Sequence, residues 1–165
     1  MDFKVLTWLF AAAVTLHNLE EAIWLPNWSA SAGRWHHPVR ADVFRFAVLA
    51  LTLLAYVASV LASLGDKQGA GAYLVAGYAL AMLLNVVFPH LLATVALRRY
   101  APGMMTALIL NLPVTVGLLR QAAVEGYIDL DKFVFIGPLV VVGIGASIPV
   151  LFTAGKRILG SLVKS

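Results

Sequence analysis

Five stretches of this chain are apolar and long enough to cross a bilayer, and this feature constrains the fold most strongly. A helix needs about 20 mostly apolar residues to span the hydrocarbon core, which is roughly 30 Å thick. Of the 165 residues, 61% are hydrophobic and only 12% are charged, about half the charged share of a soluble domain. We therefore expect an all-α integral membrane bundle of five transmembrane helices, forming one domain over residues 1–165. The expected spans are residues 4–24, 41–64, 70–97, 103–123 and 132–152.

The stretch "AGKRILGSLVKS" at the C-terminus is too short and too basic to span. On a helix, Ile158 and Leu159 would lie on one face and Lys156 and Arg157 on the other. This pattern predicts a short C-terminal interfacial helix that lies on the bilayer. A frayed basic tail is the alternative.

The distribution of basic residues predicts the orientation. Five spans place the first loop, the third loop and the C-terminus on one side, and basic residues are enriched on the cytoplasmic side of membrane proteins. We expect an inner (cytoplasmic) membrane protein with its N-terminus out and its C-terminus in. These charges set topology, so we expect no nucleic-acid partner. The basic residues on the cytoplasmic side are Arg34, Arg40, Arg45, Arg98, Arg99, Lys156, Arg157 and Lys164.

The stretch "LHNLEEAIW" places one histidine and two carboxylates inside the first apolar segment. His17, Glu20 and Glu21 are spaced i, i+3 and i+4, so they lie on one face of a helix within about one turn. Ionisable residues inside spans are rare, face the bundle interior or water, and mark functional sites by default. The motif therefore predicts one wall of a polar cavity.

The expected topology brings further polar residues to the same depth. His90, in "NVVFPH", falls in the cytoplasmic half of the third span, and the first loop carries His36 and His37 on the same side. Asn85 and Asn111 fall near the middle of the third and fourth spans. We expect these side chains to join the first span in one cavity in the inner leaflet.

The residue types in this cavity suit a divalent metal ion. The chain has no cysteine, and histidine with carboxylate suits zinc, iron or manganese. A glutamate that does not bind the metal would act as general acid or base. Asn85 and Asn111 would orient the histidines or only join helices. The candidate metal ligands are His17, Glu20, Glu21 and His90, with His36 or His37, and the candidate catalytic residues are His17, Glu20 and Glu21.

These residues favour a membrane-embedded metalloenzyme, a hydrolase or an oxidoreductase, that acts on a lipid or another hydrophobic small molecule. Three alternatives stay open. The cluster could transfer protons without metal, as in an isomerase or cyclase. It could carry protons or metal ions, in a single chain or a homo-oligomer. The two glutamates could also form buried salt bridges with Arg40, Arg45 or Arg98.

The letters His–x–x–Glu–Glu at residues 17–21 resemble the family of small bacterial and archaeal multi-span membrane proteins named for its HXXEE motif. "NVVFPH" resembles a second, histidine-bearing motif of that family. The resemblance implies that these residues form one site, and it supplies no reaction because the family's function is uncharacterised. In residue types alone, the site is also similar to EXPERA-type membrane proteins, which include sterol isomerases and transfer protons without metal.

Overall fold

The first helix is longer than its sequence predicts. In the computed structural model, which describes residues 1–32 and 38–162, α1 (Phe3–Ala30) begins at Asp2, whose carboxylate accepts a hydrogen bond from the backbone N–H of Val5. The expected end at residue 24 is wrong, because the helix continues through Pro26. A proline leaves the carbonyl four residues earlier without its helical donor. Here that carbonyl belongs to Ala22 and accepts a hydrogen bond from Arg45 Nε at 3.1 Å, so the helix continues past the proline.

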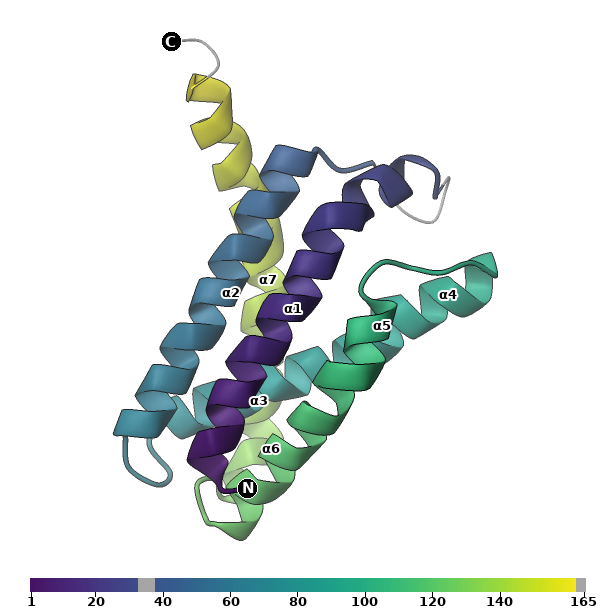
Figure 1. The fold of residues 1–165 in the computed structure, drawn as a ribbon. Coiled ribbons are helices and arrows are strands. Elements are labelled where there is room, and N and C mark those ends of the chain that lie inside the picture. The colour runs from purple at the N-terminus through teal and green to yellow at the C-terminus, as the bar shows by residue number, and fades with distance from the viewer. Residues whose placement is uncertain (33–37, 163–165) are drawn as a thin grey trace.

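A long helix packs beside α1 along the bundle (Figure 1). The helix α2 (Ala41–Leu64) runs antiparallel to α1 and is joined to it by side-chain hydrogen bonds. Asn18 donates to the hydroxyl of Thr52 at 2.8 Å, and Ser59 donates to the carbonyl of Thr7 at 2.8 Å. These polar contacts hold α1 against its neighbour at two depths.

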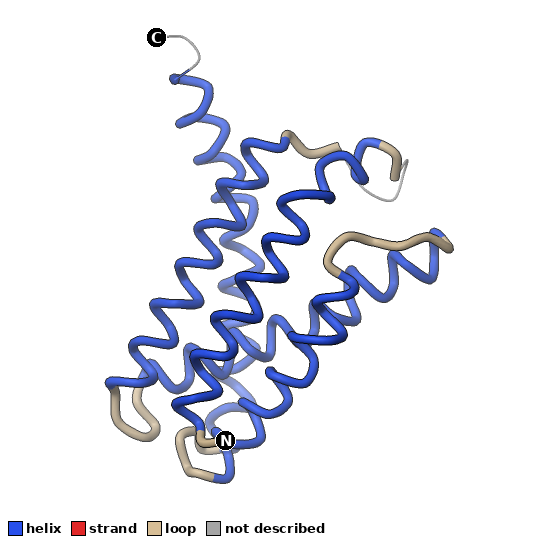
Figure 2. The backbone as a smooth tube through the Cα atoms, in the orientation of Figure 1, coloured by secondary structure: helices blue, strands red, loops and turns tan. Residues whose placement is uncertain are grey.

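The expected third and fourth spans are each interrupted by a π-helical turn. The third consists of α3 (Ala70–Asn85), η2 (Val86–Leu91) and α4 (Leu92–Leu97). It bends at Phe88, whose φ of −130° and ψ of 116° are the extended values that a following proline favours. The fourth consists of α5 (Met104–Thr106), η3 (Ala107–Asn111) and α6 (Leu112–Val124). The tube in Figure 2 shows both segments as bent rods joined by a loop.

The last helix, α7 (Leu130–Leu162), runs for 33 residues without a break. The expected separate C-terminal helix is therefore wrong, because the basic stretch forms the last turns of α7. Gly155 lies close to Phe46 of α2, where a Cβ would come within 3.0 Å of its ring, and this close packing continues the helix past the expected end at residue 152. In Figure 1 the end of α7 extends beyond α1 and α2.

Four helical stretches among the described residues are long and apolar enough to cross a membrane, as expected of a multi-pass membrane protein. The helix α1 is also long enough, but His17, Asn18, Glu20 and Glu21 lower its hydropathy. The four stretches are Ala41–Leu64, Ala70–Leu97, Met104–Val124 and Leu130–Ser161.

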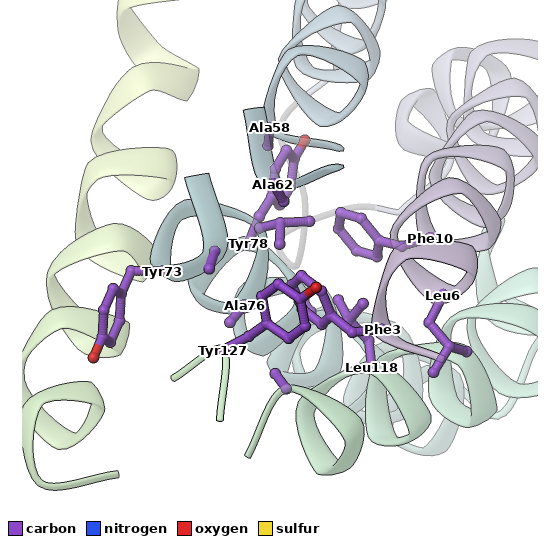
Figure 3. Packing of buried hydrophobic residues seen from close by; sticks show 14 of the residues in the cluster. Phe3, Leu6, Phe10, Ala58, Ala62, Tyr73, Ala76, Tyr78, Leu118 and Tyr127 are labelled. Atoms are coloured by element: carbon purple, nitrogen blue, oxygen red, sulfur yellow. The ribbon is translucent and has the colours of Figure 1, made fainter. Parts of the chain in front are cut away.

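An apolar core fills the end of the bundle that holds the N-terminus (Figure 3). Phe3 stacks on Tyr127 with ring centroids 4.0 Å apart, and Phe10 meets Tyr78 edge-on at 5.5 Å. Gly77 of α3 lies directly against α7, because a Cβ there would be 2.5 Å from Cβ of Val140. On α1 the last member of this core is Val14, and the polar residues of the helix follow.

Candidate functional site

Three potential metal ligands meet where α1 passes the bend in the third segment. Glu21 Oε1 lies 3.4 Å from His90 Nε2 and 4.0 Å from His17 Nε2, and the three atoms lie within 4.8 Å of one another. Ligands about 2.1 Å from a tetrahedral zinc ion lie about 3.4 Å apart. The three side chains therefore need only small shifts to surround one ion.

The local structure explains why these three side chains converge. His17 and Glu21 are one turn apart on α1 and so share a face. His90 follows Pro89 inside the π-helical turn, and its ring meets that of His17 nearly at right angles, with centroids 4.9 Å apart. Both imidazoles are buried, and Glu21 is 15% exposed.

Asn85 lies between the two imidazoles. Its Nδ2 is 3.2 Å from His17 Nε2 and 3.0 Å from His90 Nε2. An amide N–H₂ is a double donor, so it bonds the lone pair of each Nε2. Those are the lone pairs that would bind a metal ion.

Glu20 binds a different part of the chain, the segment 100–106. Its Oε1 accepts hydrogen bonds from the hydroxyl of Tyr100 and from the backbone N–H of Gly103, the latter at 2.9 Å. Its Oε2 accepts from the backbone N–H of Thr106 at 3.1 Å and from the Thr106 hydroxyl at 2.6 Å. The structure thus separates the two glutamates of the motif: Glu21 faces the histidines, and Glu20 binds the segment 100–106.

Gly103 brings the backbone of that segment against the site. Its φ is +91°, and a Cβ at this position would lie 2.5 Å from His90 Cε1, 2.9 Å from His17 Cε1 and 3.1 Å from Glu21 Cγ. Only glycine fits both the left-handed backbone and the close approach.

The three potential metal ligands form the polar end of a cavity of about 790 Å³. Asn85 shares this end, and side chains from α1, α2, the bent third segment and α7 line the rest. Apart from Glu21 and the two histidines, Tyr78 is the only ionisable lining residue in the described part of the chain, and its hydroxyl donates to the carbonyl of Leu51. The apolar lining includes Phe44, Val48, Met82, Phe88, Ile144 and Phe152.

One remaining candidate, Asn111, is not among the residues that line the cavity. Asn111 is fully buried, and neither polar atom of its amide has a hydrogen-bond partner among the described residues. His36 and His37 lie outside the described residues. Within the described chain, neither glutamate of the motif pairs with an arginine: Arg40 pairs with Asp42 at 2.6 Å, and Arg45 donates to the carbonyl of Ala22.

The sequence reasoning missed Tyr100, Gly103 and Thr106, which surround Glu20. A signal was present in "PGMMT", where a Pro-Gly turn precedes a helix and a hydroxyl residue follows three positions later. Glu20 also binds the backbone N–H groups of Gly103 and Thr106, and residue types alone do not reveal such contacts.

Comparisons with known proteins identify relatives of this chain. A family model described as "Protein of unknown function with HXXEE motif" matches residues 8–118, a range that holds all three ligands, Asn85 and the segment 100–106. The uncharacterized protein YrkK of Bacillus subtilis (strain 168) is 36% identical over 149 residues, which cover 90% of this chain and 94% of that protein. No solved structure matches the chain.

Proposed function

The chain belongs to the HXXEE-motif family, and we propose that it is a membrane-embedded, metal-dependent enzyme that acts on a lipid or another hydrophobic substrate. One observation carries the proposal. His17, Glu21 and His90 present three ligand atoms to one point, and this point is the polar end of a large apolar cavity.

The ligand set supports a catalytic rather than a structural ion. Two histidines and one carboxylate leave a coordination position open, as in catalytic zinc sites and in non-haem iron enzymes. A zinc, iron or manganese ion held in this way supplies a Lewis acid at the polar end of the cavity. Burial of both imidazoles keeps bulk water away from the ligands and orients the rings. The reaction is a hydrolysis or an oxidoreduction.

The cavity supports a hydrophobic substrate. Its walls, including Phe44, Met82 and Ile144, provide apolar contact along most of its length. The Asn85 amide shares the polar end of the cavity with the three proposed ligands. A molecule dissolved in the bilayer would therefore place its apolar part in the cavity and its polar part beside the ligands.

We further propose that α1 is a fifth span and that the site lies in the cytoplasmic half of an inner-membrane protein, N-terminus out and C-terminus in. In support, the C-terminal ends of α1 and α7 and the start of α2 lie at one end of the bundle, and the N-terminus lies at the other (Figure 1). An odd number of spans gives this arrangement.

Elemental analysis of the full chain purified in detergent tests the metal. We expect a stoichiometric zinc, iron or manganese content that is lost in His17→Ala and in His90→Ala. Asp66→Asn is the control, because this exposed turn residue lies far from the cluster, and it should retain the ion. The proposal is wrong if the wild-type protein carries no ion and takes up none of the three metals when they are added.

A second candidate is metal-free proton transfer by an isomerase or cyclase, with glutamate and histidine as acid and base. The wide apolar cavity beside the cluster favours it equally, because this chemistry needs the same substrate space. Turnover that persists in the presence of strong chelators would select this candidate. A carrier of protons or ions is less well supported, since apolar side chains fill the bundle between the cluster and the N-terminal end, among them Phe10, Val14 and Leu118.

A further inference from the structure

We propose that Glu20 is a positioning residue: it holds the segment 100–106 against the two histidines and, through the hydroxyl of Thr106, fixes which ring nitrogen of His17 carries the proton. The consequence for metal affinity rests on the proposed function. The effect on the protonation of the ring does not, and it can be measured on the protein without metal.

The Thr106 hydroxyl has a single proton and two possible acceptors for it, Glu20 and His17. Thr106 Oγ1 lies 2.6 Å from Glu20 Oε2 and 3.0 Å from His17 Nδ1. An ionised carboxylate only accepts hydrogen bonds, so the hydroxyl proton points to Glu20. The oxygen of Thr106 then presents a lone pair to His17, and Nδ1 of His17 must be the donor.

This tautomer leaves Nε2 of His17 without a proton. With the proton on Nδ1, a neutral His17 has a lone pair on Nε2, which faces Glu21 and Asn85. The hydrogen bond that the Asn85 amide donates to Nε2 supports this tautomer independently. Carboxylates that fix a histidine ligand in this way are typical of metal sites, and here a threonine hydroxyl relays the interaction.

Glu20 also holds the backbone at Gly103. The N–H of Gly103 donates to Glu20 at 2.9 Å. The glycine backbone reaches within contact of both rings, so a shift of this segment would change the space around both ligands.

The hydrogen-bond count excludes Glu20 from the ligand set. Its two oxygens accept four hydrogen bonds from Tyr100, Gly103 and Thr106, which uses the acceptor capacity of a carboxylate. Glu21 accepts none of these bonds and faces the histidines. The paired glutamates of the motif thus have different tasks: one contributes a ligand atom, and the other orders the segment that positions His17.

Thr106→Val tests the hydroxyl relay, because valine keeps the shape and removes the oxygen. Thr106→Ser keeps the oxygen, and Thr15→Val is the matched control, since Thr15 lies on α1 and its hydroxyl bonds the backbone of Ala11 away from the cluster. In metal-free protein labelled with ¹⁵N-histidine, we expect His17 to be protonated on Nδ1 in the wild type, in Thr106→Ser and in Thr15→Val. In Thr106→Val the population should shift towards the Nε2-protonated form. An unchanged His17 signal in Thr106→Val would overturn the proposal.

Zinc titration by calorimetry gives the second readout. Loss of a group that orients a metal-bound histidine typically weakens metal binding 10–100-fold. We expect this loss in Thr106→Val and in Glu20→Gln, and near wild-type affinity in Thr106→Ser and Thr15→Val. If the wild type binds none of zinc, iron and manganese while the tautomer shifts as expected, the metal proposal fails and the positioning role of Glu20 stands. If Thr106→Val weakens zinc binding without a tautomer shift, the positioning role is refuted.

Discussion

Gly103→Ala should destabilise the protein through two separable effects. The first is backbone strain, because a φ of +91° is costly for any residue with a Cβ, about 1–2 kcal/mol. The second is steric, because the new Cβ would lie 2.5 Å from His90 Cε1 and 2.9 Å from His17 Cε1. Forcing an extra carbon into a packed interior costs typically about 1–3 kcal/mol. We expect the free energy of unfolding to fall by about 2–5 kcal/mol in total.

Gly126→Ala separates the two effects. Gly126 also has a positive φ, +73°, but a Cβ there would meet nothing within 4 Å. This variant should show the strain alone, about 1–2 kcal/mol. Reversible unfolding in mixed micelles, followed by circular dichroism, measures both variants under the same conditions.

The two variants should also differ at the site. Gly103→Ala displaces both imidazoles, so we expect weaker zinc binding in this variant and unchanged zinc binding in Gly126→Ala. If Gly103→Ala is no less stable than Gly126→Ala and binds zinc as the wild type does, the described contact between the glycine backbone and the histidines is wrong.

Three further variants test other contacts. Gly77→Ala should lower the free energy of unfolding by about 1–3 kcal/mol, because its Cβ would collide with Val140, and the cost in a Val140→Gly background should be smaller, as a double-mutant cycle would measure. Partial burial and the hydrogen bond to Glu20 raise the pKa of Tyr100, so its stabilising contribution is present below the ordinary phenol pKa of about 10 and lost as the pH rises through the raised value. Stability should therefore fall more steeply at alkaline pH in the wild type than in Tyr100→Phe, which a pH series of unfolding curves would test. Asn111→Leu should be neutral or stabilising by up to about 1–3 kcal/mol, because it removes a buried amide without partners among the described residues; a large loss of stability would show that this amide has a partner.

The sequence identified the apolar segments, but it located their ends less accurately. The limits expected for α2 match the structure, since clear loop signals, "GDKQG" among them, follow the apolar run. The end of α1 was wrong because it depends on Arg45, a residue of another helix that replaces the donor lost at Pro26. Sequence reasoning identifies the proline as a helix breaker, but only tertiary structure reveals this compensation.

The candidate site was also predicted only in part, because some of its contacts depend on tertiary structure. The spacing of His17 and Glu21 and the depth of His90 are properties of helices in a known order, so their convergence could be expected from the sequence. The different partners of Glu20 and Glu21 could not be predicted, because Glu20 binds backbone N–H groups of a loop and of the turn that follows it. The positions of such groups depend on how the chain turns at Gly103.

The hydrogen bonds of Glu20 have a consequence for the order in which this protein enters the membrane. All the groups that bond this carboxylate lie at least 80 residues later in the chain. A charged carboxylate at the centre of a lone membrane helix costs about 2.5–3.5 kcal/mol on insertion scales. When α1 leaves the ribosome, it therefore carries its polar motif without the groups that later satisfy it. If α1 spans the membrane, as proposed, its stable insertion would then be completed by the fourth segment, long after its own synthesis.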